Sequence, residues 1–202
     1  MLIGVLGAGR MGRGLGSAWA GSGLEVALGS RDPQEARSRV GEVPRLQVTD
    51  LATAAAAPVV VLATPFGVTT DLLPRLADLL RGKVVVDITN PFGAAPPGRS
   101  GLWVHQEALG VPATWVAAFK TNFAATVGAP DFVVRQCLIA SDDPEALATT
   151  ADLARRAGFA PLACGGLDVA PALDLMVPLM LSLDRMHGTG AGRSHWRFVA
   201  EH

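Results

Sequence analysis

The sequence predicts an α/β fold in which a doubly wound parallel sheet is followed by a small helical C-terminal lobe. Short apolar runs alternate with helical windows along the first 164 residues. Runs without polar alternation are typical of parallel strands that are covered on both faces. From about residue 165 this pattern gives way to one long apolar helix and a glycine-rich tail. We therefore expect two units, residues 1–164 and residues 165–202.

Each expected strand is an apolar or β-branched run. The six runs are Leu2–Leu6, Glu25–Leu28, Val59–Ala63, Val84–Ile88, Trp115–Phe119 and Val133–Ala140. The helical windows are Arg10–Ser22, Pro33–Val40, Val68–Leu80 and Pro144–Ala157. Two of these windows begin with an acidic N-cap before a first-turn proline, at Asp32 and Asp143. Strands and helices that alternate at this spacing indicate crossover connections in a parallel sheet.

The C-terminal lobe is expected to contain one long helix, Ala170–Met186, with a kink at Pro178. Because this helix is apolar nearly all round, one sheet face cannot cover it, and we expect a homodimer that buries it. Earlier in the chain, residues 90–101 are rich in proline and glycine. Loops of about this length inside a compact domain often bind ligands.

Composition argues against several classes of protein. The 17 Lys and Arg residues nearly balance the 18 Asp and Glu residues, for a net charge of −1, so no nucleic-acid or membrane partner is expected. No apolar run reaches the roughly 18 residues of a membrane span. The first residues lack the basic region of a signal peptide, so a cytoplasmic location is expected. The two cysteines, Cys137 and Cys164, and the scattered histidines show no metal-ligand spacing, so no metal is expected.

A glycine-rich turn, Gly7-Ala8-Gly9-Arg10-Met11-Gly12, follows the first expected strand. Its place between a strand and a helix, ahead of a second strand, is that of a dinucleotide-binding Rossmann fold. Gly7 permits the tight turn, Gly9 lets a pyrophosphate approach the backbone, and Gly12 lets the helix pack on the strand. The helix N-terminus at Arg10 and Met11 would then stabilise the phosphates.

The end of the second expected strand favours NADP(H) over NAD(H). Ser30 and Arg31 stand where an NAD-binding fold usually has an acid for the ribose hydroxyl. Arginine can bind a phosphate in bidentate fashion, and serine can donate a hydrogen bond to it. Asp32 could instead be a ribose acid, although its place before Pro33 suits a helix cap better. An ordinary solvated surface residue is the alternative for Arg31.

Five segments together carry a family pattern: the glycine turn, Gly29-Ser30-Arg31, Asp87-Ile88-Thr89-Asn90-Pro91, Ala118-Phe119-Lys120-Thr121-Asn122 and Gly188-Thr189-Gly190. They resemble the NADPH-dependent reductases of the deazaflavin coenzyme F420, over nearly the whole chain. The resemblance implies a Rossmann domain, a small C-terminal lobe and a dimer. It implies that the cofactor also contacts Ala63, Thr64, Pro65, Thr89, Asn90 and Pro91. It implies that the second substrate contacts Phe119, Lys120, Thr121, Asn122, Gly188 and Gly190.

The function expected from these features is hydride transfer between NADP(H) and F420 or a flavin-type acceptor. Relatives of this group are also found in flavin-dependent metalloreductases, so the acceptor could be another flavin. No catalytic acid or base is assigned, because ring-to-ring hydride transfer needs mainly a dry site that holds both rings. Reduction of a small carbonyl or imine is the enzymatic alternative. A non-catalytic NADPH sensor is the alternative from another class.

Three cations and one aromatic residue are candidates for the acceptor site. Lys120 follows an apolar strand and could either bind an anionic group of the substrate or be an exposed strand-end charge. Because F420 carries an acidic, phosphate-containing tail, Arg99 and Arg193 are further candidates to hold it. Trp103 is a candidate wall for the ring.

Overall fold

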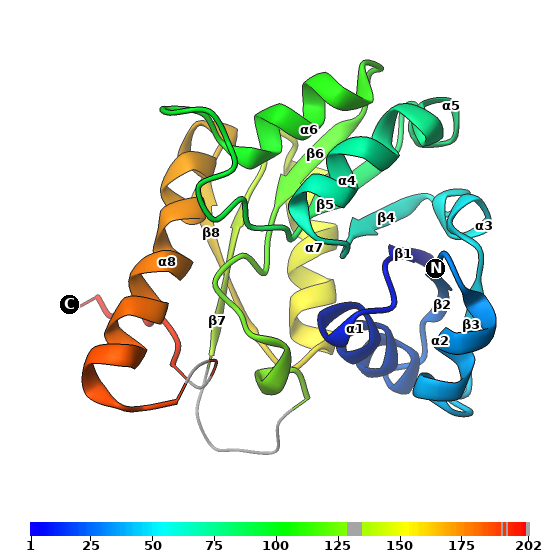
Figure 1. Ribbon diagram of the computed structural model, residues 1–202, viewed down its shortest axis with the longest axis horizontal. Helices are drawn as coiled ribbons and strands as arrows, with labels where there is room; N and C mark the ends of the chain where they lie inside the picture. Colours follow the sequence, from blue (N-terminus) through cyan, green and yellow to red (C-terminus); the bar gives the residue numbers. More distant parts are fainter. Residues whose placement is uncertain (129–134, 191, 193, 201–202) are drawn as a thin grey trace.

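A central sheet organises the fold, which Figure 1 shows for the computed structural model; the structure describes residues 1–128, 135–190, 192 and 194–200. Within these residues, eight strands lie in the order β3-β2-β1-β4-β5-β6-β7-β8. Neighbouring strands are parallel, except β6 and β7, which are antiparallel. The strands are β1 Leu2–Leu6, β2 Glu25–Gly29, β3 Leu46–Thr49, β4 Val59–Leu62, β5 Val84–Asp87, β6 Thr114–Ala117, β7 Gln136–Ala140 and β8 Ala160–Gly165. The strand order reverses between β1 and β4, which is where such sheets bind ligands.

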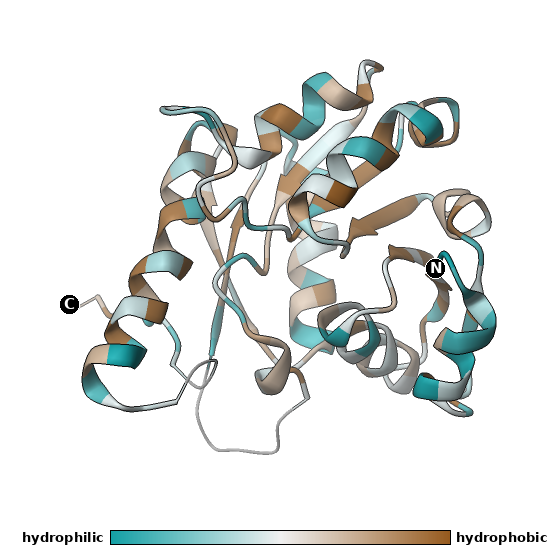
Figure 2. Ribbon diagram, in the orientation of Figure 1, coloured by the Kyte–Doolittle hydropathy of each residue, from teal (hydrophilic) through white to brown (hydrophobic). Residues whose placement is uncertain are grey.

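Helices cover both faces of the sheet. The α-helices are α1 Arg10–Gly21, α2 Pro33–Val40, α3 Leu51–Ala55, α4 Phe66–Leu72, α5 Ala77–Leu80, α6 Gly101–Leu109, α7 Pro144–Arg156 and α8 Ala170–His187. Short 3-10 turns are η1 Leu73–Leu76, η2 Ala124–Thr126 and η3 Leu167–Val169. One core contains side chains of α1 and α7, and the other contains side chains of η1, α6 and α8. Figure 2 shows the apolar strands between these layers. The predicted doubly wound α/β class is confirmed.

Local chemistry sets the helix ends. The carboxylate of Asp32 accepts a hydrogen bond from the backbone N–H of Glu35 at 2.9 Å, and that of Asp143 accepts one from Ala146 at 2.8 Å. Both predicted N-caps are therefore confirmed. The window expected as one helix, Val68–Leu80, is instead α4, η1 and α5. Pro74 has no N–H to continue the helical ladder, so α4 ends at Leu72.

Two strands of the sheet, β3 and β8, were not predicted from the sequence. The edge strand β3 has four residues, of which Gln47 and Thr49 are polar, so its apolar signal is short. The other edge strand, β8, contains Pro161 and ends in Gly165, and both residue types are uncommon within strands. The start expected for β7 at Val133 lies outside the described residues, and β7 is described from Gln136.

The last helix, α8, begins and ends within one residue of the expected range and contains Pro178. Its inward face carries apolar side chains together with Asp174 and Asp184, which are both buried. Its outer face exposes Leu175, Leu179, Leu183 and Met186. Among the described residues, no helix combines the length and hydropathy that a bilayer crossing requires.

Candidate active site

The glycine turn after β1 has the geometry that a bound pyrophosphate requires. Gly7 has a φ of +124°, which side chains rarely adopt. A Cβ atom on Gly12 would lie 1.9 Å from the carbonyl oxygen of Gly7, so α1 can approach β1 this closely only with glycine there. Nothing lies within 4 Å of the position that a Cβ of Gly9 would occupy. Gly9 is also the N-cap of α1, where the backbone N–H groups favour an anion.

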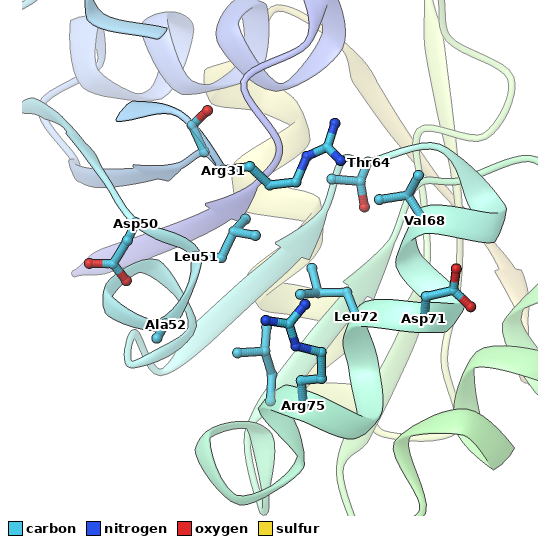
Figure 3. Close-up of a pocket in the computed structure, with 11 residues that line it drawn as sticks. Arg31, Asp50, Leu51, Ala52, Thr64, Val68, Asp71, Leu72 and Arg75 are labelled. Atoms are coloured by element: carbon cyan, nitrogen blue, oxygen red, sulfur yellow. The ribbon is translucent and has the colours of Figure 1, made fainter. Parts of the chain in front are cut away.

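A cleft beside the end of β2 is bordered by the residues predicted to choose between NADP(H) and NAD(H). A cavity of about 260 Å³ is lined by Gly7, Ala8, Gly9, Ser30, Arg31, Asp32, Glu35, Ala36, Arg39, Leu51, Ala63, Thr64 and Pro65. Asp32 caps α2 there. This agrees with its interpretation as a helix cap, which the sequence favoured over that of a ribose acid. A neighbouring cavity of about 660 Å³ has Arg31 and Arg75 on its walls, as Figure 3 shows. Two guanidinium groups therefore border the space next to the expected ribose.

A third cavity, of about 660 Å³, lies where the carboxyl ends of β1, β4 and β5 meet the segment after β6. We call it the ring pocket. It is lined by Gly9, Arg10, Met11, Ala63, Thr64, Pro65, Phe66, Gly67, Ile88, Thr89, Asn90, Pro91, Phe92, Ala94, Phe119, Asn122, Phe123 and Ala124. Four segments that are distant in the sequence thus meet at one site. Three further phenylalanines of this list, Phe66, Phe92 and Phe123, could not be predicted from the sequence, since they lie in loops and at a helix start with no periodic signal.

The ring pocket is poor in groups that could move a proton. Of the described side chains that line it, none carries a carboxylate, an imidazole, a thiol or an amine, and the guanidinium of Arg10 is the one ionisable group. Phe92 is 62% exposed and has a φ of +47°, which places this aromatic side chain at the rim. The lining therefore offers apolar contact and hydrogen bonds from Thr64, Thr89 and the amide groups, and it provides no general acid.

A buried ionic cluster lies behind the ring pocket. It consists of Asp87 at the end of β5, His105 on α6, Lys120 after β6 and Asp174 on α8, with 0%, 0%, 1% and 5% of each residue exposed. The ammonium of Lys120 donates to Asp174 Oδ1 at 2.8 Å and to the carbonyl oxygen of Thr89 at 2.7 Å. It also lies 3.7 Å from Asp87 Oδ2.

The imidazole of His105 bridges two acceptors. Its Nδ1 lies 3.1 Å from Asp87 Oδ2, and its Nε2 lies 3.2 Å from the carbonyl oxygen of Phe66. Both partners are oxygen atoms that accept hydrogen bonds, so the two contacts hold the imidazole between the end of β5 and the start of α4. Burial alone would raise the pKa of Asp87, but the charge of Lys120 and the hydrogen bond from His105 outweigh it and lower that pKa to about 2. In the interior, the carboxylates of Asp87 and Asp174 thus both lie close to the ammonium of Lys120.

The cluster holds the walls of the ring pocket in place. Lys120 fixes the carbonyl of Thr89, and in return the side-chain amide of Asn90 donates to the carbonyl of Lys120 at 2.9 Å. Asp174 Oδ2 accepts from the hydroxyl of Ser100 at 2.7 Å and from the N–H of Gly101 at 2.8 Å, where α6 begins. The position of α8 is therefore linked to the pocket through hydrogen bonds.

This placement corrects the interpretations of Lys120. The alternative of an exposed strand-end charge is wrong, because the side chain is buried and paired with Asp174. Lys120 also does not line the ring pocket, and its ammonium is bound to Thr89 and Asp174, so the geometry gives no support to the expected contact with an anionic substrate group. Thr121 is likewise buried, at 2% exposed, and does not line the pocket. This partner could not be predicted from the sequence, since Asp174 lies 54 residues away in an apolar helix.

The other candidates for the acceptor site lie apart from the pocket. Gly188 ends α8 with a φ of +63°, and Gly190 has a φ of +80°, so both turn the chain without lining the ring pocket. Trp103 is on α6 and packs against the core beneath it. Arg99 donates to both carboxylate oxygens of Glu107, at 3.0 and 2.6 Å. Arg193 lies outside the described residues.

The cysteines and acidic residues form no second reactive centre in the part of the chain that the structure describes. No group of three or more His, Cys, Asp and Glu side chains there is arranged to hold a metal ion. Burial raises the pKa of the Cys137 thiol to about 12, so this group stays protonated and inert. Cys137 is therefore a structural side chain of the core.

The fold and the ring pocket define a dinucleotide-binding oxidoreductase, and comparison with known proteins gives the family. A family model described as NADP oxidoreductase coenzyme F420-dependent matches residues 2–91. The F420-dependent NADP reductase of Methanothermobacter thermautotrophicus is 32% identical over 207 residues, which cover 91% of this chain and 89% of that protein. The chain therefore belongs to the coenzyme F420-dependent NADP oxidoreductase family, whose members are NADP-dependent enzymes.

Two further proteins are similar to this chain. The rat metalloreductase STEAP3 is 35% identical over 182 residues, which cover 89% of this chain and 36% of that protein. A solved structure assigned as an F420-dependent NADP reductase, from Arthrobacter sp. FB24, has a TM-score of 0.80 and 27% identity. It covers 92% of this chain and 94% of that chain. The predicted family and the predicted oxidoreductase class are confirmed.

Proposed function

We propose that this protein transfers a hydride between NADP(H) and a deazaflavin of the F420 type, with both rings in the ring pocket. The observation that carries the proposal is the chemistry of that pocket, which has apolar and amide walls and no described proton donor other than a guanidinium. Its volume of about 660 Å³ lies within the range of roughly 300–1,000 Å³ that is usual for ligand sites.

The nature of the lining favours a ring acceptor over a carbonyl or imine. Reduction of a carbonyl leaves charge on one oxygen, which a positioned acid normally protonates. A redox ring instead spreads the charge of the incoming hydride over conjugated atoms, so positioning and the exclusion of water are the main requirements. The residues of this chain supply those two requirements through the glycine turn, the Thr89-Asn90-Pro91 turn and Phe119.

The cofactor half of the proposal rests on the cleft at β2. Arg31, Arg39 and Arg75 border the two cavities beside the expected ribose. Among the described residues, Arg31 makes no ion pair with a carboxylate, so its guanidinium can bind a 2′-phosphate. Ser30 stands beside it, and its hydroxyl donates to the carbonyl of Asp32 at 2.9 Å.

The direct experiment is anaerobic mixing of the protein with NADPH and one acceptor at a time, following the absorbance of each chromophore. We expect rapid bleaching of F420 with NADPH, and much slower bleaching with NADH. FMN, FAD, a ferric chelate, and a small carbonyl and imine are the comparison acceptors. Turnover of the carbonyl or imine without F420 would contradict the proposal. Binding of NADPH with no turnover of any acceptor would indicate a sensor instead.

A flavin is the second candidate acceptor. It is favoured by the similarity to a metalloreductase, at 35% identity over 89% of this chain. The same pocket and the same cofactor would serve it, since a flavin is also a planar redox ring. Reduction of FMN or FAD at a higher kcat/KM than F420 in the same experiment would establish this candidate.

A further inference from the structure

A basic groove continues from the ring pocket along the outer side of α1. The groove encloses about 400 Å³ and is lined by Arg10, Arg13, Gly14, Ser17, Arg39, Val40, Ala124 and Ala125. Arg10 and Ala124 also line the ring pocket, so the two spaces adjoin. The described lining contains three guanidinium groups and no carboxylate. A ligand that leaves the ring pocket on this side therefore meets a positive surface.

Two of these arginines are placed against the usual preference of a helix. Arg10 and Arg13 lie in the first turn of α1, which contains no acidic residue. The N-terminal end of a helix carries partial positive charge, so a cation there is unfavourable by roughly 0.3–1 kcal/mol unless an anion compensates. Departures from this preference are expected mainly at functional sites.

The same two arginines also lack internal partners. Several surface arginines of this chain pair with a carboxylate, as Arg45 does with Glu25 at 2.6 Å and Arg156 with Asp152 at 2.6 Å. For Arg10 and Arg13, no side-chain hydrogen bond or ion pair is found among the described residues. Arg10 lies at the glycine turn, where the pyrophosphate of a dinucleotide would compensate it. Arg13 lies three residues further along α1, and no described carboxylate pairs with it.

We propose that this groove binds the acidic tail of the acceptor, a chain with phosphate and carboxylate groups attached to the redox ring. This inference rests on the proposed function, because it assumes a ring in the adjoining pocket. Arg13 and the hydroxyl of Ser17, which is four residues on and on the same face of α1, would bind the anionic groups. Two of the candidates considered from the sequence do not compete, because Lys120 is buried and Arg99 is paired with Glu107.

The dinucleotide itself is the rival occupant, and the groove distinguishes the two. Arg39 lines both the groove and the cleft at β2, so its removal would affect either ligand. Arg13 and Ser17 line the groove and none of the other cavities described above. Arg13 is therefore the position at which binding of the tail and binding of the cofactor separate.

The test compares two deazaflavins that share the ring. One is F420 itself, and the other is its tail-free form, which ends at the ribityl alcohol and carries no phosphate. Initial rates with saturating NADPH are measured for the wild type, for Arg13→Ala and Arg13→Gln, and for Arg155→Ala. Arg155 is an exposed arginine of α7 that lines none of these cavities, so it controls for the change in net charge.

The expected result is specific to the tail. Both Arg13 variants raise the KM for F420 about tenfold, as for the loss of one charge-assisted contact, and their KM for the tail-free ring matches that of the wild type. Added salt raises the wild-type KM for F420 more steeply than that of the variants. Arg155→Ala behaves as the wild type with both acceptors.

Four other results would overturn the inference. Equal changes in KM for both deazaflavins, or no change for either, would show that the groove does not bind the tail. Hydride transfer to a deazaflavin would still stand in that case. A matching rise in the KM for NADPH would assign the groove to the cofactor. If the wild type reduces neither deazaflavin, the proposed function fails and this occupant fails with it.

Discussion

Charged side chains have opposite roles at the two ends of the binding site, the cleft beside β2 and the buried cluster behind the ring pocket. At the β2 end, the guanidinium groups of Arg31 and Arg75 border open cavities, where a phosphate can replace water. At the β5–β6 end, the ammonium of Lys120 is buried beside the carboxylates of Asp87 and Asp174, and the imidazole of His105 contacts Asp87. The first arrangement leaves charge free to select a ligand. The second uses charge within the protein to fix the pocket walls.

The difference has an energetic consequence. A buried charge that loses its partner is strongly destabilising, whereas an exposed arginine can be removed with little effect on folding. Variants of the buried cluster should therefore change the free energy of unfolding. Variants at the β2 end should change the affinity for NADPH. The following changes test whether the two ends separate in this way.

The largest effect is expected from Asp174→Ala. The substitution leaves the ammonium of Lys120 buried without its carboxylate and removes the acceptor for Ser100 and Gly101. We expect a loss of about 3–5 kcal/mol in the free energy of unfolding, measured by urea denaturation. Asp168→Ala, at an exposed position just before α8, is the matched control and should cost less than about 0.5 kcal/mol. A loss below about 1 kcal/mol for Asp174→Ala would remove the distinction between the two ends.

Arg31→Ala should act on the cofactor alone. Loss of a charge-assisted contact to the 2′-phosphate should weaken NADPH binding by about 1.5–3 kcal/mol and leave NADH binding nearly unchanged. Titration of the quenching of tryptophan fluorescence, or calorimetry, gives both affinities, and urea denaturation should show wild-type stability. Equal losses of affinity for NADPH and NADH would show that Arg31 does not bind the 2′-phosphate.

Acid should weaken the buried end through Asp87. Its pKa in the folded protein is about 2, against an ordinary value of 3.8. Because the folded-state value is the lower one, the stabilisation is present above about pH 5 and is lost as the pH falls toward 2. At 1.36 kcal/mol per pH unit the loss is about 2 kcal/mol. Between pH 5 and pH 2, we therefore expect the free energy of unfolding of Asp87→Asn to fall less than that of the wild type, by about 2 kcal/mol.

The control for this pH dependence is Asp152→Asn. Asp152 pairs with Arg156 on the surface of α7, where water screens the interaction, so its acid dependence should follow the wild type. If Asp87→Asn and Asp152→Asn have the same acid dependence, the lowered pKa of Asp87 is not a source of stability.

The smallest effect on folding is expected from Leu179→Glu. This side chain is 50% exposed on the outer face of α8, beside Leu175 and Leu183, and the predicted homodimer would bury it. Light scattering should give a dimer for the wild type at micromolar concentration and a monomer for the variant. A wild type that is monomeric at that concentration would contradict the predicted dimer.

What the sequence could predict follows the same division. Glycines, caps and the Ser30-Arg31 pair act through local geometry, so their positions along the chain were enough to predict the β2 end. The ring pocket was predicted in part: Thr89, Asn90 and Phe119 follow strands that end at one edge of the sheet. The buried cluster could not be predicted, because Lys120 and Asp174 meet only through tertiary packing and an acid in an apolar helix has no periodic signal. Phe92 and Phe123 were missed because loop residues carry no pattern of their own.

Transfer of a labelled hydride tests the central claim most directly. NADPH carrying deuterium on either face of the nicotinamide C4 is mixed with F420 and the protein without oxygen, and the reduced deazaflavin is analysed by mass spectrometry and NMR. Two rings held face to face in a pocket that excludes water should pass the label directly from one face, with deuterium on the ring carbon of the product. Hydrogen from solvent at that carbon, or label from both faces equally, would contradict the account.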